Sequence, residues 1–175
     1  IAPAPDAGID GALTVCDQGA AADLLAALGG GADPGGSWSG PSVVVGNMYD
    51  PATMTPGAYV YTVTGAAPCG SASATVTVSE TGSPNAGSDG SLTVCSDGSA
   101  TNLFTSLGGG PDAGGTWSGP SALAGGVFDP ATNIAGTYTY TLSATAPCLG
   151  DQSQVVVSIA PAPDAGIDGA LTVCD

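Results

Sequence analysis

The sequence predicts an all-β protein made of tandem copies of one small domain. Shifting the chain against itself by 79 residues (95 minus 16) superimposes Cys16 on Cys95 and Trp38 on Trp117 without a gap. Gly, Pro, Ser, Thr and Val are abundant and helix-favouring residues are few, which is typical of short strands joined by tight turns. Apolar and polar residues also alternate in several short segments, as expected for strands with one buried face.

The repeat divides the chain into two copies and the start of a third. The first copy covers residues 1–79, the second covers 80–158, and residues 159–175 begin a third because they are identical to residues 1–17. This verbatim return indicates that a two-copy unit was duplicated, so we expect the natural chain to be longer than this sequence. The short, proline-containing link between copies is predicted to restrict bending and to favour an extended rod.

The first elements of a copy follow from local patterns. Residues 12–16 (ALTVC) alternate like a strand. Residues 20–31 (AAADLLAALGGG) admit either a bent strand or one or two helical turns, because their counterpart (SATNLFTSLGGG) replaces alanines with poorer helix formers. Either structure would bury Leu24 and Leu28. Glycines then flank a short strand that carries Trp38.

The second half of the copy contains its clearest strands. Asp50 precedes a proline in YDPAT, a turn or helix-start signature in which the carboxylate accepts backbone N–H groups. Residues 57–65 (GAYVYTVTG) and 73–79 (SATVTVS) form a predicted hairpin with Cys69 near its tip. Six or seven short strands, one tryptophan and one disulfide in each copy predict an immunoglobulin-like β-sandwich.

The five cysteines fit the repeat if each copy contains one pair. Cys16 and Cys69 lie 53 positions apart (69 minus 16), as do Cys95 and Cys148, while Cys174 matches Cys16 and would pair with a residue outside the sequence. The sequence has no Cys-x-x-Cys spacing and no histidine, which argues against a zinc site. We therefore predict the disulfides Cys16–Cys69 and Cys95–Cys148, which place the protein outside the cytosol.

The charge of the chain excludes several classes of function. It carries fifteen acidic residues and no Lys, Arg or His. Such a surface cannot neutralise phosphate groups, so neither nucleic acid nor anionic lipid is an expected partner, and no apolar run is long enough to span a membrane. General acid–base catalysis at neutral pH usually draws on His or Lys, so we predict that the protein is not an enzyme.

The segments PNAGSDGSLTVC, LGGGPDAGGTWSGPS, FDPAT and GTYTYTLSATAPC resemble the tandem repeats of very large cell-surface proteins of gliding and related Bacteroidota. These are adhesins of the gliding-motility type, which the type IX secretion system exports. The resemblance covers both copies almost end to end. It implies an extracellular, cell-surface repeat region that forms a stalk or filament for adhesion or gliding motility. The expected partners are neighbouring repeats, and surface or glycan ligands would bind through other parts of the protein.

Two alternatives to a stalk remain open. The first is a self-assembling extracellular filament or surface layer, in which copies of the chain contact one another. The second is a glycan-binding repeat stiffened by calcium, the single cofactor weighed, because hard oxygen ligands suit Ca²⁺. Turn and cap roles account for aspartates in such loops without a metal. The candidate ligands are aspartates that recur at equivalent positions of the two copies: Asp10, Asp33, Asp50, Asp89, Asp112 and Asp129.

Aromatic residues recur at equivalent positions as well. Trp38 and Trp117 have faces on which a sugar ring could stack, but a single tryptophan in a small sandwich more often fills the core. Tyr59 and Tyr138 have the same interpretation, because each lies on the strand with the clearest alternation. The sequence therefore favours four core aromatics over a sugar site at these positions.

Overall fold

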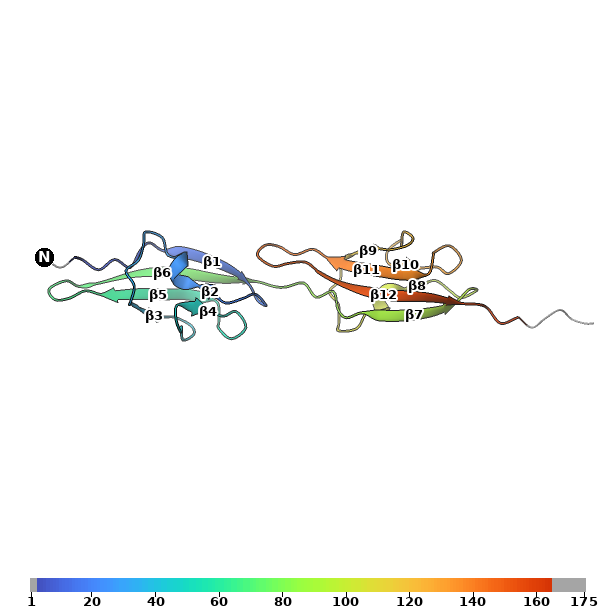
Figure 1. The fold of residues 1–175 in the computed structure, drawn as a ribbon, viewed down its shortest axis with the longest axis horizontal. Coiled ribbons are helices and arrows are strands. Elements are labelled where there is room, and N and C mark those ends of the chain that lie inside the picture. The colour runs from blue at the N-terminus through green and yellow to red at the C-terminus, as the bar shows by residue number, and fades with distance from the viewer. Residues whose placement is uncertain (1–2, 165–175) are drawn as a thin grey trace, which may run out of the picture. The chain divides into compact units, whose positions relative to one another are not determined.

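The computed structural model describes residues 3–164, which form two units (Figure 1). Unit 1 comprises the chain up to Pro84 together with Ser143–Gly150, and unit 2 comprises Asn85–Leu142 and the chain from Asp151 onward. Unit 1 therefore follows the first copy of the repeat but also takes in two short segments of the second, residues 80–84 and Ser143–Gly150. No helix in the described residues is long and apolar enough to cross a membrane.

Unit 1 is an all-β structure with a four-stranded sheet and a two-stranded ribbon. The sheet has the order β1-β6-β5-β3, and the ribbon pairs β2 with β4. β1 runs parallel to β6, whereas the other pairs are antiparallel. The bounds are β1 Gly11–Cys16, β2 Ala22–Asp23, β3 Ser37–Ser39, β4 Met48–Tyr49, β5 Gly57–Thr64 and β6 Ser71–Thr81.

Unit 2 repeats this topology. Its sheet has the order β7-β12-β11-β9, with β7 parallel to β12, and its ribbon pairs β8 with β10. The bounds are β7 Gly90–Cys95, β8 Thr101–Asn102, β9 Thr116–Ser118, β10 Val127–Phe128, β11 Gly136–Leu142 and β12 Asp151–Ala160. The predicted copy boundary at residue 79 falls inside a strand, because β6 continues to Thr81.

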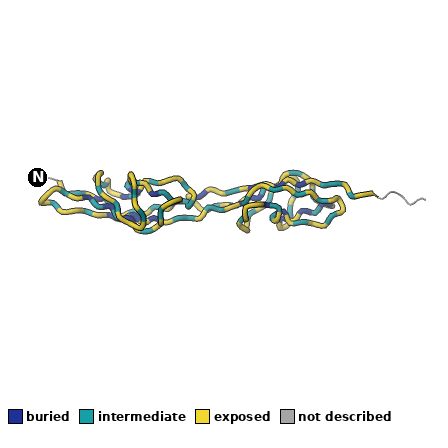
Figure 2. Tube along the Cα trace, turned by 90° about the horizontal axis from the view of Figure 1, so that it is seen from below, coloured by how far each residue is buried: buried dark blue, intermediate teal, exposed yellow. Residues whose placement is uncertain are grey.

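The core of each unit lies between its sheet and its ribbon. In unit 1 the sheet contributes alternate residues of β5, and Tyr59 and Tyr61 are almost completely buried. The ribbon contributes Tyr49, whose ring meets the ring of Tyr59 edge to face at a centroid distance of 5.6 Å. Most buried positions lie on strands, a few such as Leu28 and Cys148 lie in turns and loops, and most loop residues are exposed or half-buried (Figure 2). Strand alternation therefore predicted the buried face of β5 correctly.

The segment that the sequence left undecided contains both expected structures in short form. The two-residue strand β2 leads into a single helical turn, α1 (Leu24–Ala27). Asp23 caps this turn by accepting hydrogen bonds from the backbone N–H groups of Leu25 and Ala26. The counterpart in unit 2 is the 3₁₀ turn η1 (Leu103–Ser106). Leu24 and Leu28 are buried, as predicted.

Each core tyrosine also satisfies its hydroxyl group. Tyr61 Oη accepts a hydrogen bond from Gly36 N and donates one to Asp33 O, both at 2.8 Å. Tyr140 makes the same pair of bonds with Gly115 and Asp112. The tyrosine thus ties the loop before the tryptophan strand to the sheet, which explains why this residue is a tyrosine rather than a phenylalanine in both copies.

We expect Tyr61→Phe to lower the free energy of unfolding by about 1–2 kcal/mol, because one backbone donor and one backbone acceptor lose their partner. Urea unfolding followed by circular dichroism would measure the loss. Tyr140→Phe should give a similar loss through unit 2. A loss below about 0.5 kcal/mol in both proteins would show that water replaces the hydroxyl without cost.

Candidate functional site

The parallel pairing of β1 with β6 sets the position of Cys16. The register places Cys16 opposite Thr81, so both residues lie where their strands end. The backbone N–H of Asp17 then donates to Thr81 O at 3.0 Å. Cys16 therefore lies at the end of the sheet from which β6 leaves the first copy.

Cys16 forms a disulfide with Cys148, a residue of the second sequence copy. The S–S distance is 2.13 Å and the Cα atoms are 5.0 Å apart, a separation that disulfides commonly span. Cys148 is buried and belongs to Ser143–Gly150, the loop between β11 and β12 that is part of unit 1. The bond encloses a stretch of 132 residues. By the chain-entropy argument, such a loop destabilises the unfolded chain by about 5 kcal/mol.

The predicted pairs Cys16–Cys69 and Cys95–Cys148 are therefore wrong. Cys69 lies just before the start of β6, whereas Cys16 lies beside its end. Ten residue steps along β6, at about 3.3 Å each, separate the two ends by roughly 33 Å. A disulfide requires Cα atoms within about 7 Å, so a copy with this topology cannot close on its own pair.

Sequence spacing alone could not have distinguished the two pairings. Cys16 is followed after 53 residues by Cys69 and after 132 residues by Cys148, and these separations differ by one repeat length. The predicted pair Cys16–Cys69 requires the end of the first strand to lie beside the hairpin tip of its own copy. The parallel direction of β1 is what excludes that arrangement.

Polar contacts surround the bond. Asp17 Oδ1 accepts hydrogen bonds from Ser83 Oγ at 2.7 Å and from Ser83 N at 2.9 Å. The Ser83 hydroxyl, followed by its backbone N–H, lowers the pKa of the Asp17 carboxyl below its ordinary value. The sulfur of Cys148 lies 3.1 Å from Thr81 O. Sequence analysis missed Asp17 and Ser83, because in the second copy the equivalent residues are Ser96 and Ala162.

The other cysteines occupy matching places. Cys69 is half-buried in the loop between β5 and β6, and Cys95 is exposed at the end of β7. Cys174 lies outside the described residues. Cys69 thus corresponds to Cys148, and Cys95 corresponds to Cys16.

The candidate calcium ligands serve as hydrogen-bond acceptors for the backbone. Asp10 Oδ1 accepts from Thr75 N at 2.7 Å, and Asp89 Oδ1 accepts from Gln154 N at 2.8 Å. These two bonds join the turn before the first strand to the last strand of the same unit. The shared role accounts for the recurrence of this aspartate.

The other two pairs of aspartates behave in the same way. Asp33 Oδ2 accepts from Asp6 N, and Asp112 Oδ2 accepts from Asn85 N, each at 2.9 Å. Asp50 and Asp129 cap the turns that follow them, through bonds from Ala52 N and Ala131 N, as YDPAT and FDPAT predict. The replacement of Asp6 by Asn85 preserves a turn bond to the N–H two residues later.

These six aspartates do not come together. Within residues 3–164, the single group of three side chains with metal-ligating atoms close to one another consists of Cys16, Asp17 and Cys148. Two of its members are the sulfurs of the disulfide, which has no thiolate to offer a metal. The observed role of the recurring aspartates is therefore to satisfy backbone groups in loops.

The predicted core aromatics differ in burial. Tyr59 and Tyr138 are fully buried. Trp38 and Trp117 are only half-buried, and they pack on Tyr61 and Tyr140 at ring-centroid distances of 4.9 and 5.1 Å. Each tryptophan therefore covers the rim of its core.

The surroundings of the two indole groups differ. Trp38 Nε1 donates to Asn47 Oδ1 at 2.9 Å, whereas the position of Asn47 is taken by Gly126 in unit 2. The backbone is alike at both positions: φ is 63° at Asn47 and 76° at Gly126, and the two carbonyls accept from the backbone N–H groups of Leu24 and Leu103 respectively. Among the described residues, Trp117 Nε1 has no hydrogen-bond acceptor.

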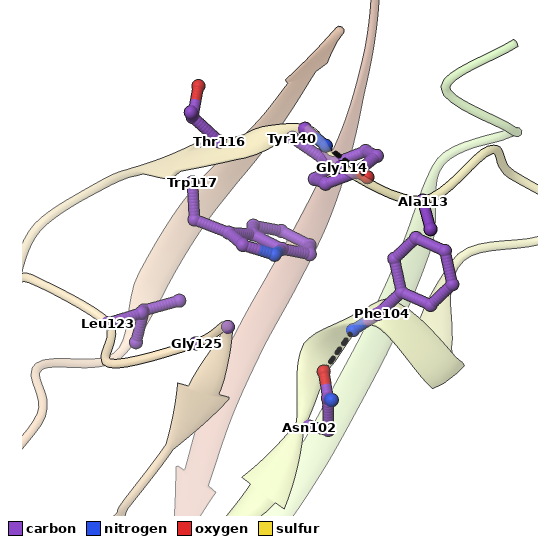
Figure 3. A pocket seen from close by; sticks show the side chains of 11 residues that line it. Asn102, Phe104, Ala113, Gly114, Thr116, Trp117, Leu123, Gly125 and Tyr140 are labelled. Carbon is purple, nitrogen blue, oxygen red and sulfur yellow. Dashed lines mark hydrogen bonds between the residues drawn. The ribbon is translucent and has the colours of Figure 1, made fainter.

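A pocket of about 480 Å³ opens beside this indole group (Figure 3). Phe104, Trp117 and Tyr140 give it an aromatic wall, and Leu123 and Asn102 line other parts of it. The equivalent of Phe104 in the first copy is Leu25. Sequence comparison of the copies contained this signal, namely the paired replacement of Asn47 by glycine and of Leu25 by phenylalanine.

A second paired replacement lies at the other end of the ribbon. Tyr49 Oη donates to Glu80 Oε1 at 2.6 Å, and burial, followed by this carboxylate, raises the pKa of Tyr49 well above its ordinary range. In the second copy the pair becomes Phe128 and Ile159, so the hydrogen-bonded pair is replaced by two apolar residues of the same core. Neither partner changes alone, as expected for residues in contact.

Comparison of the chain with known protein families finds no matching family, and no curated protein matches it. The fold and the site are therefore interpreted from the contacts described above.

We expect Asp17→Asn to lower the thermal midpoint at pH 7 relative to Asp97→Asn, which removes the same charge from an exposed turn after β7. The lowered pKa means that folding favours the ionised Asp17. Its contribution is thus present above the ordinary carboxyl pKa and is lost as the pH falls through the lowered pKa of the folded state. The difference between the midpoints of the two variants should therefore shrink as the pH is lowered below the ordinary carboxyl pKa, and a constant difference between them would contradict this role.

Proposed function

We propose that the chain is a structural repeat region of a large secreted adhesin on the cell surface. In this proposal the repeats form an extended stalk that resists tension during adhesion or gliding motility. The observation that carries the proposal is the bond between Cys16 and Cys148, which joins two distant points of the chain across 132 residues.

The position of this bond determines how tension would pass along the chain. A pull on the two ends enters β1 before Cys16 and leaves through β12 after Cys148. Covalent bonds then carry the tension from one cysteine to the other, and the backbone between them cannot be drawn out. The chain contains no lysine, so Lys–Asn isopeptide bonds cannot serve this purpose, and the disulfide is the available covalent brace.

The strand order supports an immunoglobulin-like sandwich for each unit. In that fold the last strands and a central strand share one sheet, and the remaining strands form the other. Strands β6, β5 and β3 would be the first of these sheets, and the β2–β4 ribbon would be a reduced second sheet. The first strand pairs with the last strand, which places its cysteine at the end of the domain.

The disulfide and the charge both support a position outside the cell. A disulfide in a short, loop-rich repeat is typical of secreted proteins. The absence of Lys and Arg from the sequence removes every cleavage site for trypsin-like proteases. Fifteen carboxylates would also keep neighbouring stalks apart over roughly 8 Å at physiological salt. The same charge opposes the alternative of a self-assembling filament. Fibres that form as the protein concentration rises would support that alternative.

The stalk proposal is tested by pulling the chain from its two ends in a single-molecule force experiment. We expect reduction of the disulfide to increase the extensible length by roughly 450 Å, since it frees 132 residues of up to about 3.5 Å each. The double variant Cys16→Ser/Cys148→Ser should show this length without a reductant, and Cys95→Ser should behave like the native chain. An equal extension with and without reductant would overturn the proposal.

A second candidate function is the binding of a neutral sugar in the pocket of unit 2. Three aromatic side chains line the pocket, and aromatic faces stack on the C–H groups of sugar rings. The unpartnered indole N–H of Trp117 and the side-chain amide of Asn102 can bond to hydroxyl groups. The net charge of −15 disfavours an anionic ligand. This function would add adhesion to the stalk itself.

We expect Gly126→Asn to weaken binding to an array of neutral oligosaccharides by at least tenfold. A side chain at this position approaches Trp117 Nε1 and would occupy the indole N–H, as Asn47 does in unit 1. Gly110→Asn is the matched control, because Gly110 also has a positive φ and a side chain there would meet no atom within 4 Å. Equal binding by Gly126→Asn and the native chain, or no binding by the native chain, would reject this function.

A further inference from the structure

The bond between Cys16 and Cys148 is made from two half-sites, and residues 3–164 contain each of them twice. One half-site is the end of the first strand of a copy, and the other is the tip of the hairpin formed by its last two strands. Cys16 and Cys148 supply one of each. Cys95 and Cys69 occupy the equivalent positions and belong to the other two half-sites.

The strand-end half-site at Cys95 has the same backbone hydrogen bonds as the one at Cys16. Ser96 N donates to Ala160 O at 2.8 Å, as Asp17 N does to Thr81 O. The turn after the cysteine also closes in the same way, through Gly98 N to Cys95 O at 2.9 Å. Cys95 is thus held at the end of its sheet in the position that Cys16 has in unit 1.

The side-chain bond that ties the linker to this half-site is also preserved. In unit 1, Ser83 N donates to Asp17 Oδ1 at 2.9 Å. In unit 2, Ala162 N donates to Ser96 Oγ at 3.0 Å. The two residues have changed in sequence, but the bond between them remains. The exit of the chain from the sheet is therefore directed in the same way in both units.

The hairpin-tip half-sites match each other too. Cys148 N donates to Thr145 O at 3.0 Å, and Cys69 N donates to Ala66 O at 2.8 Å. Each cysteine directly follows a proline, Pro147 or Pro68. The hairpin tip at Cys69 therefore has the same local backbone bond as the hairpin tip at Cys148, to which Cys16 is linked.

We propose that the strand-end cysteine of every copy forms a disulfide with the hairpin-tip cysteine of the next copy along the chain. Cys95 then binds the tip of a third copy, which residues 159–175 begin. The contact geometry at Cys95 and the bond at Cys16 carry this inference, together with the repeat length. It extends the proposed stalk to a longer array, but its test depends on the partner of Cys95, and the force experiment uses Cys95 only as a control.

The bond forms by oxidation of two thiols. One S–S bond replaces two S–H bonds, and the two hydrogens with their electrons pass to a disulfide oxidant, which becomes two thiols. Successive bonds overlap in sequence, because Cys95 lies between Cys16 and Cys148. Every residue between the first and last bonds of an array would then lie inside at least one covalent loop, so breaking one bond would leave its neighbours closed.

The test uses the full chain lengthened by residues 18–79 after Asp175, which completes the third copy. Cys69→Ser and Cys174→Ser are included so that four cysteines remain: Cys16, Cys95, Cys148 and the tip cysteine of the added copy. If Cys16 binds Cys148, the added tip can then pair only with Cys95. After folding with oxidised glutathione, we expect no thiol to react with Ellman's reagent in denaturant. Digestion at aspartate, needed because the chain lacks trypsin sites, should give a peptide in which Cys95 is linked to the added tip.

Two controls separate the new bond from general oxidation. Replacing the added tip cysteine by serine should leave Cys95 as the one reactive thiol, with Cys16–Cys148 intact. Replacing Cys95 by serine should leave the added tip as the one reactive thiol, which also shows that the lengthened chain folds. A reactive Cys95 in the complete chain, or its linkage to Cys148, would overturn the proposal while leaving the stalk function open.

Discussion

The parallel pairing of the first strand with the last is the constraint on which the rest of this structure depends. An antiparallel first strand would end near the tip of its own hairpin, and each copy could then close on its own cysteine pair. In the parallel arrangement Cys16 reaches the end of the sheet where the chain leaves the copy. The partner available there is the hairpin tip of the following sequence copy, so the disulfide joins copies instead of closing one.

This constraint changes what a small domain needs from its cysteines. A copy of this size buries only about 60% of the surface of its unfolded chain, and an internal disulfide would usually compensate for the small core. Here the cores rely on tyrosines whose hydroxyl groups bind loop carbonyls, and on aspartates that accept bonds from backbone N–H groups. The sulfurs of Cys16 and Cys148 instead join two sequence copies, where their bond resists the separation of distant parts of the chain.

The two copies share a framework but differ in chemistry at defined points. The Tyr49–Glu80 pair becomes Phe128 and Ile159, and the Asn47 amide that caps Trp38 is replaced by Gly126. Tyr49 and Glu80 are replaced together, whereas the replacement of Asn47 by Gly126 leaves a pocket open beside Trp117. A verbatim two-copy duplication keeps these differences in alternation, so an array built in this way would present an aromatic pocket on every second copy.

By itself, the sequence determined the repeat, the all-β class, the buried faces of the long strands and the turn role of Asp50, because each of these depends on residues close together in the chain. It also identified the aspartates that recur, although it did not decide between metal and backbone as their partner. Only the tertiary structure decided the cysteine pairing and the burial and hydrogen bonding of the two tryptophans. The separations of 53 and 132 residues are equally compatible with a repeat, and the direction of a strand within its sheet leaves no mark on its own alternating pattern. That direction is a long-range property, and it alone determines which cysteines can meet.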